Sequence, residues 1–131
     1  NIGVSLLERL KYNPALKARR KESRAMRIAV PKALTRQIII KQGAKCYLCQ
    51  VQGVPISRFN KWRVVIPDEY YPVEPWQKWN GKVKLTFHID HIKPVCVGGT
   101  NDPDNLRLAC PTCNGKNHYL RYMVEHGILE V

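Results

Sequence analysis

The sequence predicts an α+β fold, in one compact domain of 131 residues with a helical arm at its N-terminal end. Three observations lead to this fold class. Apolar residues recur at helical spacing in residues 4–10 and 31–43, they alternate with polar residues from 83 to 90, and a second apolar run covers 105–109. No run approaches the roughly 18 to 20 uncharged apolar residues that cross a bilayer, so no membrane partner is expected.

Helices are expected first along the chain. Asn13 and Pro14 separate a helix at 4–10 from a basic helix at 14–29, because proline is favoured at the first position of a helix. A third helix is expected at 31–43, where Gly43 ends it. Residues 50–82 are rich in proline and aromatic residues. They are expected to form an irregular insert with one short strand at 63–66, in which the aromatic residues build a satellite core.

A strand with one apolar face is expected from residue 82 onward. Its alternation puts two polar side chains, His88 and Asp90, on the other face and His91 at the strand end. The remaining elements are expected in this order: a turn-rich loop at 97–104, a second strand at 105–109, and a last helix that begins at Pro111 or Thr112 and ends near Glu125.

The charge of the chain makes a polyanion the first partner to consider. Twenty-two basic residues against ten acidic ones give a net charge of +12. Residues 1–45 hold twelve of these basic residues and only two acidic ones, so the excess lies mainly at the N-terminal end. A solvated helical surface or a contact with an anionic membrane explains such a segment equally well. The domain limits predicted from this pattern are a basic helical arm at 1–30 and a globular domain at 31–131.

Four of the five cysteines form two Cys-x-x-Cys pairs, Cys46 with Cys49 and Cys110 with Cys113. Two such pairs complete a tetrahedral shell of four thiolates, which suits zinc. A disulfide pair, a redox dithiol and an iron–sulfur site are the competing interpretations, and they fit this pattern less well. Because four thiolates leave no place for a substrate, the predicted zinc ion is structural.

The segment FHIDHIKPVCVGGTNDPDNLRLACPTCNGKNHY at 87–119 resembles the HNH nucleases. That family carries Asp-His at a strand end, a Gly-Gly loop, Asn-Leu in the next strand, and Cys-x-x-Cys followed by His or Asn. His91, Asn105 and Asn114 fall on the three positions that name the family, with thirteen and eight residues between them. The resemblance implies a ββα-metal (His-Me finger) core, and it covers about residues 32–119 without the insert and the arm.

The resemblance also implies roles for individual residues. His91 is the expected general base, and an imidazole suits this because it titrates near neutral pH. Asp90 and Asn114 are the expected ligands of a catalytic Mg²⁺ or Mn²⁺, since both offer hard oxygen atoms. Asn105 is expected to orient the region around His91. The family often has histidine where this chain has Asn114, which makes that ligand weaker.

Further residues complete the expected site. Two additional histidines, His88 and His118, are candidate ligands of the catalytic ion. The basic residues expected to contact DNA are Arg19, Arg20, Lys21, Arg24, Arg27, Lys93, Arg107 and Lys116.

The function that follows is a metal-dependent DNA endonuclease that leaves 5′-phosphate and 3′-hydroxyl ends. It would nick one strand, or cut both strands as a homodimer. As a bacterial or phage-encoded protein it would act in the cytoplasm or in association with the nucleoid. The alternative is a zinc-stabilised module that binds nucleic acid without cutting it. A protein-interaction zinc domain of the RING or ribbon kind is a weaker third hypothesis, because it leaves Asp90, His91 and the basic arm unexplained.

Overall fold

The computed structural model describes residues 14, 29–114 and 118–128, with no side-chain placement for 96 and 118–121. The helices predicted at 4–10 and 14–29 therefore lie outside the described residues, apart from their positions 14 and 29. The elements in chain order are α3 (Lys32–Gln42), β1 (Val54–Arg58), β2 (Lys61–Pro67), β3 (Val83–Thr86), β4 (His88–His91), η1 (Val95–Val97), η2 (Pro103–Asn105), β5 (Leu106–Ala109) and α4 (His118–Glu125). This confirms the predicted α+β class.

Helix α3 has the limits that the sequence predicts. Ile38 and Ile39 form its buried side. Gly43 ends the helix in the left-handed conformation with a φ of 65°, and Ala44 follows at 58° and donates its N–H to the carbonyl of Ile39. This double left-handed turn reverses the chain and leads directly into the first cysteine pair.

The short strand predicted at 63–66 is confirmed as part of β2, but the rest of the insert is more regular than predicted, because residues 54–67 form a hairpin of two strands, β1 and β2. The strands pair antiparallel from Val54↔Val65 to Arg58↔Lys61, and the sheet order is β1-β2-β3. Phe59 and Asn60 connect them with φ values of 48° and 61°, as a two-residue hairpin turn of the mirror type requires. Pro55 makes β1 hard to predict from the sequence, because proline argues against a central strand. It is tolerated here because β1 lies at the edge of the sheet.

The aromatic residues of the insert divide into two groups. The rings of Trp62 and Trp76 meet edge to face with 5.4 Å between centroids, and both pack against the main core. The guanidinium of Arg36 lies 4.8 Å from each ring, so these tryptophans form the predicted satellite core next to α3. The prediction is wrong for Tyr70 and Tyr71, which are exposed.

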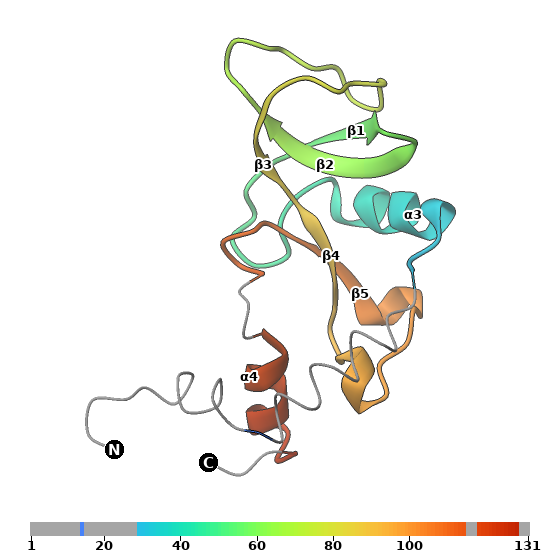
Figure 1. Cartoon of the computed structure of the whole chain (residues 1–131), viewed down its shortest axis with the longest axis vertical. Coiled ribbons are helices and arrows are strands. Elements are labelled where there is room, and N and C mark those ends of the chain that lie inside the picture. Colours follow the sequence, from blue (N-terminus) through green and yellow to red (C-terminus); the bar gives the residue numbers. More distant parts are fainter. Residues whose placement is uncertain (1–13, 15–28, 115–117, 129–131) are drawn as a thin grey trace, which may run out of the picture. The chain divides into compact units, whose positions relative to one another are not determined.

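The predicted strand at 82–91 is observed as two strands in one extended segment, with β3 and β4 separated by Phe87. Figure 1 shows this segment running from the β1–β2 hairpin to β5. β3 pairs with β2, β4 pairs with β5, and the N–H of Phe87 donates to the carbonyl of Val64 at 2.8 Å. The single segment thereby joins the insert to the part of the chain that carries the HNH motif.

One hydrophobic core holds these elements together. Its buried members come from α3, the first cysteine pair, β2, the segment between β3 and β4, and β5, namely Ile39, Ala44, Cys46, Val64, Phe87, Leu108 and Cys110. Two of the four cysteines of the predicted zinc site are therefore core residues.

Residues 30–92 and 101–115 form one compact unit, while 93–100 and α4 fall in another. The last helix begins at His118, later than predicted, because residues 111–113 form a turn. None of the helices in the described part of the chain has the length and apolar character needed to span a membrane.

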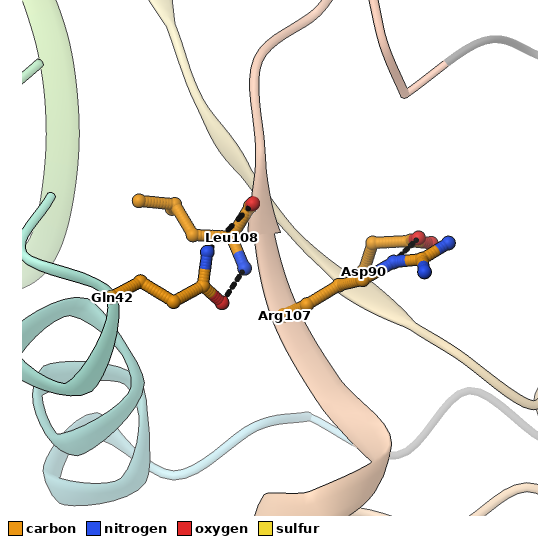
Figure 2. A network of polar contacts seen from close by, with 4 residues as sticks. All are labelled: Gln42, Asp90, Arg107 and Leu108. Carbon is orange, nitrogen blue, oxygen red and sulfur yellow. Dashed lines mark hydrogen bonds and ion pairs between the residues drawn. The ribbon is translucent and has the colours of Figure 1, made fainter. Parts of the chain in front are cut away.

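The side chain of Gln42 connects the end of α3 to β5. Its Nε2 donates to the carbonyl of Leu108 at 3.1 Å, and its Oε1 accepts the N–H of Leu108 at 2.7 Å. Figure 2 shows this pair of bonds. The side-chain amide of Gln42 bonds to the backbone of Leu108 as the backbone of a neighbouring strand would. Nε2 also donates to the carbonyl of Lys45, which leads into the first cysteine pair.

We expect Gln42→Ala to lower the free energy of unfolding by about 1–3 kcal/mol, because it leaves the N–H of Leu108 without its acceptor and removes one of the two donors to the Leu108 carbonyl, the other being the N–H of Tyr47. Gln42→Glu should cost less, since it keeps the acceptor for the N–H. Urea unfolding of the zinc-loaded protein measures both, with Gln37→Ala on the exposed side of α3 as the control. Equal stability of Gln42→Ala and Gln37→Ala would contradict the structural role of this amide.

Candidate metal centres and active site

The four predicted cysteines meet in one cluster. The sulfurs of Cys46, Cys49, Cys110 and Cys113 all lie within 4.8 Å of one another, and those of Cys49 and Cys110 are 3.7 Å apart. Four thiolates at about 2.3 Å from a tetrahedral zinc ion have sulfurs about 3.8 Å apart. The observed spacing fits that geometry, so these residues would hold the structural zinc ion.

Backbone hydrogen bonds shape the first cysteine pair. The N–H of Cys46 donates to the carbonyl of Val51 at 3.1 Å, and the N–H of Gln50 donates back to the carbonyl of Cys46 at 3.2 Å. Gln50 adopts a φ of 63°, which closes the turn. The N–H of Tyr47 donates to the carbonyl of Leu108, so this turn is attached to the outer edge of β5.

The second pair continues directly from β5. Both Cys113 and Asn114 donate their N–H groups to the carbonyl of Cys110, at 3.1 and 2.9 Å. Since Tyr47 and the second pair are both anchored to β5, the strand sets the spacing of all four sulfurs.

The pKa values of the thiols show how unfavourable the cluster is without a cation. Burial opposes ionisation of Cys46, but backbone hydrogen bonds, foremost at Cys110, outweigh it and lower the pKa of Cys46 to about 6. Burial and the neighbouring cysteine side chains raise the pKa of Cys113 to about 12. At Cys49 a hydrogen bond at the Val51 backbone lowers the pKa, yet burial and the adjacent thiols raise it overall. A divalent cation would stabilise the thiolate forms and so offset these raised pKa values.

Asp90 lies in β4 directly opposite Arg107 of β5, and the two side chains form an ion pair. Nε of Arg107 lies 3.1 Å from Oδ2 of Asp90, and the side chains are only 18% and 14% exposed (Figure 2). The guanidinium carbon lies 3.8 Å from the ring centre of Tyr47. Arg107 is thus held between a carboxylate and an aromatic ring, whereas the sequence suggested a contact with DNA.

His91 ends β4 and is hydrogen-bonded through its ring. Its Nε2 lies 2.8 Å from Oδ1 of Asn101. Asn105 lies near His91 at the same end of the strand pair. The residue after it, Leu106, pairs with His91, and the N–H of Ile92 donates to the carbonyl of Asn105 at 2.8 Å. The structure thereby brings Asp90, His91 and Asn105 together at one end of the β4–β5 pair.

The donor set at Asp90 fits a hard divalent cation held by few protein ligands. A carboxylate has about four lone-pair sites, so the contact of Oδ2 with Arg107 is compatible with a metal ligand. In the described part of the chain, the four cysteines are the only group of three or more His, Cys, Asp or Glu residues placed to hold an ion. An ion at Asp90 would keep several water ligands, as Mg²⁺ usually does, with Asn114 as the predicted second protein ligand.

The remaining predicted site residues are only partly described. His88 is exposed on β4, and Asn114 is half-buried after the second cysteine pair. Lys93 is exposed in the loop after β4, where a side chain at Gly99 would collide with the Lys93 carbonyl oxygen. The positions outside the described residues, or described without a side chain, are Arg19, Arg20, Lys21, Arg24, Arg27, Lys116 and His118.

The sequence did not identify Gln42, Tyr47 or Asn101 as contributors to this region. Gln42 and Leu108 lie 66 positions apart, and no local pattern indicates that they meet. Asn101 lies in a loop where asparagine is ordinarily a turn residue, and its contact with His91 becomes visible only in the folded chain.

Residues 78–120 match the sequence model of the HNH endonuclease family. The matched segment contains β3, β4, β5 and the second cysteine pair, so the resemblance to HNH nucleases is confirmed over this part of the chain. The same match supports a nuclease-related function and DNA as the partner. No curated protein and no solved structure matches the chain.

We expect Cys113→Ser to lose zinc and to unfold under conditions where the parent chain is folded, because structural zinc contributes on the order of 10 kcal/mol. Metal analysis and circular dichroism check this, and Cys96→Ser, at the cysteine that belongs to neither Cys-x-x-Cys pair, should keep one zinc per chain. Zinc binding to the metal-free protein should release protons, since the pKa values of Cys49 and Cys113 are raised, and zinc affinity should fall as the pH is lowered. A folded, zinc-loaded Cys113→Ser protein would contradict the four-cysteine site.

Proposed function

With an HNH endonuclease segment at residues 78–120, we propose that this chain is a divalent-metal-dependent endonuclease that hydrolyses phosphodiester bonds in DNA to 5′-phosphate and 3′-hydroxyl ends. The observation that carries the proposal is the arrangement at the end of β4. There Asp90 and His91 are consecutive, each held by a partner from a different segment, Arg107 and Asn101. Holding both side chains in place at one strand end supports a role for them as a catalytic pair.

His91 is the proposed general base. When Nε2 of His91 carries the proton, it donates the 2.8 Å hydrogen bond to Oδ1 of Asn101. The other ring nitrogen, Nδ1, then has a lone pair. Nδ1 is then the atom that removes a proton from the attacking water. The hydrogen bond also fixes the rotation of the ring, which a general base needs in order to act repeatedly on one position.

Asp90 and Asn114 are the proposed ligands of a catalytic Mg²⁺ or Mn²⁺. When bound, this ion would neutralise charge on the scissile phosphate and stabilise the leaving 3′ oxygen. The ion pair with Arg107 fixes the carboxylate of Asp90 in β4, and the backbone bond from Ile92 to Asn105 fixes the turn after His91. These contacts support a pre-organised site.

The strongly basic N-terminal arm is proposed to bind the DNA backbone through Arg19, Arg20, Lys21, Arg24 and Arg27. One core of this type attacks one strand at a time. Double-strand cleavage would therefore require two copies of the chain or two successive nicks.

A zinc-stabilised module that binds nucleic acid without cutting is the second candidate, and one observation favours it. The guanidinium of Arg107 occupies Oδ2 of Asp90, an atom that a catalytic ion would use. In a pure binding module this ion pair would be structural, and the chain would bind DNA with no requirement for Mg²⁺ or Mn²⁺.

We expect the zinc-loaded chain to convert supercoiled plasmid to nicked or linear DNA only when Mg²⁺ or Mn²⁺ is added. His91→Ala should retain zinc and DNA binding but cut at least about 100-fold more slowly, because general-base catalysis contributes roughly 10²–10⁴-fold. Gel analysis of plasmid forms over time measures both proteins. Salt-dependent binding with intact plasmid in every metal would establish the binding module instead.

We expect Asn101→Ala to lower kcat about tenfold with less than a twofold change in KM for DNA, since it frees the ring of His91 but leaves the base in place. Asn101→Asp, which keeps an acceptor oxygen, should recover most of the activity. Equal losses in both variants, or a change confined to KM, would show that Asn101 does not act through His91.

A further inference from the structure

All four charged residues in strands β1, β2 and β3 are basic: Arg58, Lys61, Arg63 and Lys84. The strand register places Arg58, Lys61 and Arg63 on one side of the sheet, because Arg58 pairs with Lys61 and Ile56 with Arg63. Lys84 lies where the register between β2 and β3 shifts. It is exposed between the half-buried Val83 and Leu85, which puts it on the same side as Thr86, the partner of Val65. Residues that face each other across an antiparallel pair share a face, and side chains alternate between faces along a strand.

The opposite side of the same sheet belongs to the core. It carries Trp62, Val64 and Ile66, which pack in the cluster around Ile39 of α3. The sheet therefore has one apolar side that packs on the domain, and another side on which every charged residue is basic, next to the buried side chains of Ile56 and Val65.

These charges are not neutralised within the described part of the chain. Lys61 and Lys84 are exposed, Arg63 is half-buried, and none of the three forms an ion pair there. Arg58 donates to the carbonyl of Gly81, and its guanidinium lies 5.5 Å from the ring centre of Phe59 at the hairpin tip. Unpaired cations on one face leave a positive potential that attracts a polyanion.

The basic side leads to the candidate active site. Beyond Lys84 and Thr86, the alternation continues across Phe87 and puts His88 and Asp90 on the same side of the β3–β4 segment. The bond from Phe87 to Val64 keeps β2 beside the strand at this point. Six residues separate Lys84 from Asp90, a distance of about 20 Å at about 3.3 Å per residue. Along B-DNA this corresponds to about six base pairs, at about 3.4 Å each.

We propose that Lys61, Arg63 and Lys84 form a backbone-binding surface for duplex DNA, the β-surface, which holds the phosphates within about six base pairs on one side of the bond that is cut. This inference rests on the proposed function. It adds a second region of DNA contact to the N-terminal arm. The β-surface thus positions the duplex for cleavage, and it does so through charge rather than base recognition.

The test compares Lys61→Gln/Lys84→Gln with Lys32→Gln/Lys45→Gln, which removes the same charge from exposed positions on and after α3. Affinity for a 30-base-pair duplex is measured by fluorescence anisotropy between about 0.05 and 0.3 M salt, without added Mg²⁺ or Mn²⁺. Each phosphate contact contributes about 0.9 to the slope of log K against log salt, so the β-surface variant should lose about 1.8 and bind about 10- to 30-fold more weakly at 0.15 M salt. The control should keep its slope.

A second measurement locates the contacts. Duplexes shortened stepwise from either side of the cut should bind the parent chain more weakly once one flank falls below about six base pairs, and the β-surface variant should be insensitive to that flank. Zinc content and urea unfolding confirm that each variant is folded.

If the parent chain binds and cuts DNA while the β-surface variant keeps the slope of the control, the β-surface is not a DNA contact and the proposed function stands. If the β-surface variant loses slope as expected but the parent chain cuts in no metal, the β-surface stands and the binding module replaces the nuclease. If the parent chain does not bind duplex DNA at all, both proposals are wrong and an acidic protein becomes the partner that fits this charge.

Discussion

The close approach of four sulfur atoms is the constraint on which the rest of the structure depends. Sulfurs within 4.8 Å of one another cannot all be thiolates without a cation, and two of them, from Cys46 and Cys110, are core residues. A zinc ion would turn this repulsion into attraction and would join two chain segments that lie 61 positions apart at Cys49 and Cys110. In a chain of this size with a thin core, such a crosslink would supply stability that a larger domain obtains from its buried apolar area.

Strand β5 transmits that constraint to the candidate active site. One of its edges donates to and accepts from the side-chain amide of Gln42 and accepts the N–H of Tyr47, and its other edge pairs with β4. With only four residues, β5 has little stability of its own, so its register depends on the zinc site at its end. The register in turn puts Arg107 opposite Asp90 and Leu106 opposite His91. A shift of one residue would move Arg107 to the other face and leave the carboxylate of Asp90 half-buried without its partner.

Local features of the sequence were sufficient for the parts of the site that depend on spacing. The cysteine pairs, the strand that ends in His91 and the helix that ends at Gly43 all have short-range signals. The hairpin of β1 and β2 was missed because Pro55 hides an edge strand, and its mirror-type turn uses Phe59, a residue with little preference for a positive φ. The bonds from Asn101 to His91 and from Arg107 to Asp90 join side chains from different segments, which only the register between strands can determine.

The ion pair between Arg107 and Asp90 bears on both candidate functions through its charge balance. Because the ring of Tyr47 holds the guanidinium from one side, Arg107 would stay beside Asp90 when a divalent cation binds. One carboxylate, one guanidinium and one divalent cation would then sum to a net charge of about +2 where the scissile phosphate is proposed to lie, and a charge that grows on that phosphate in the transition state would be stabilised. Without the cation the pair is neutral and offers the phosphate little attraction. The requirement for metal would thus arise from this pairing, and the contact of Arg107 with Asp90 is compatible with catalysis.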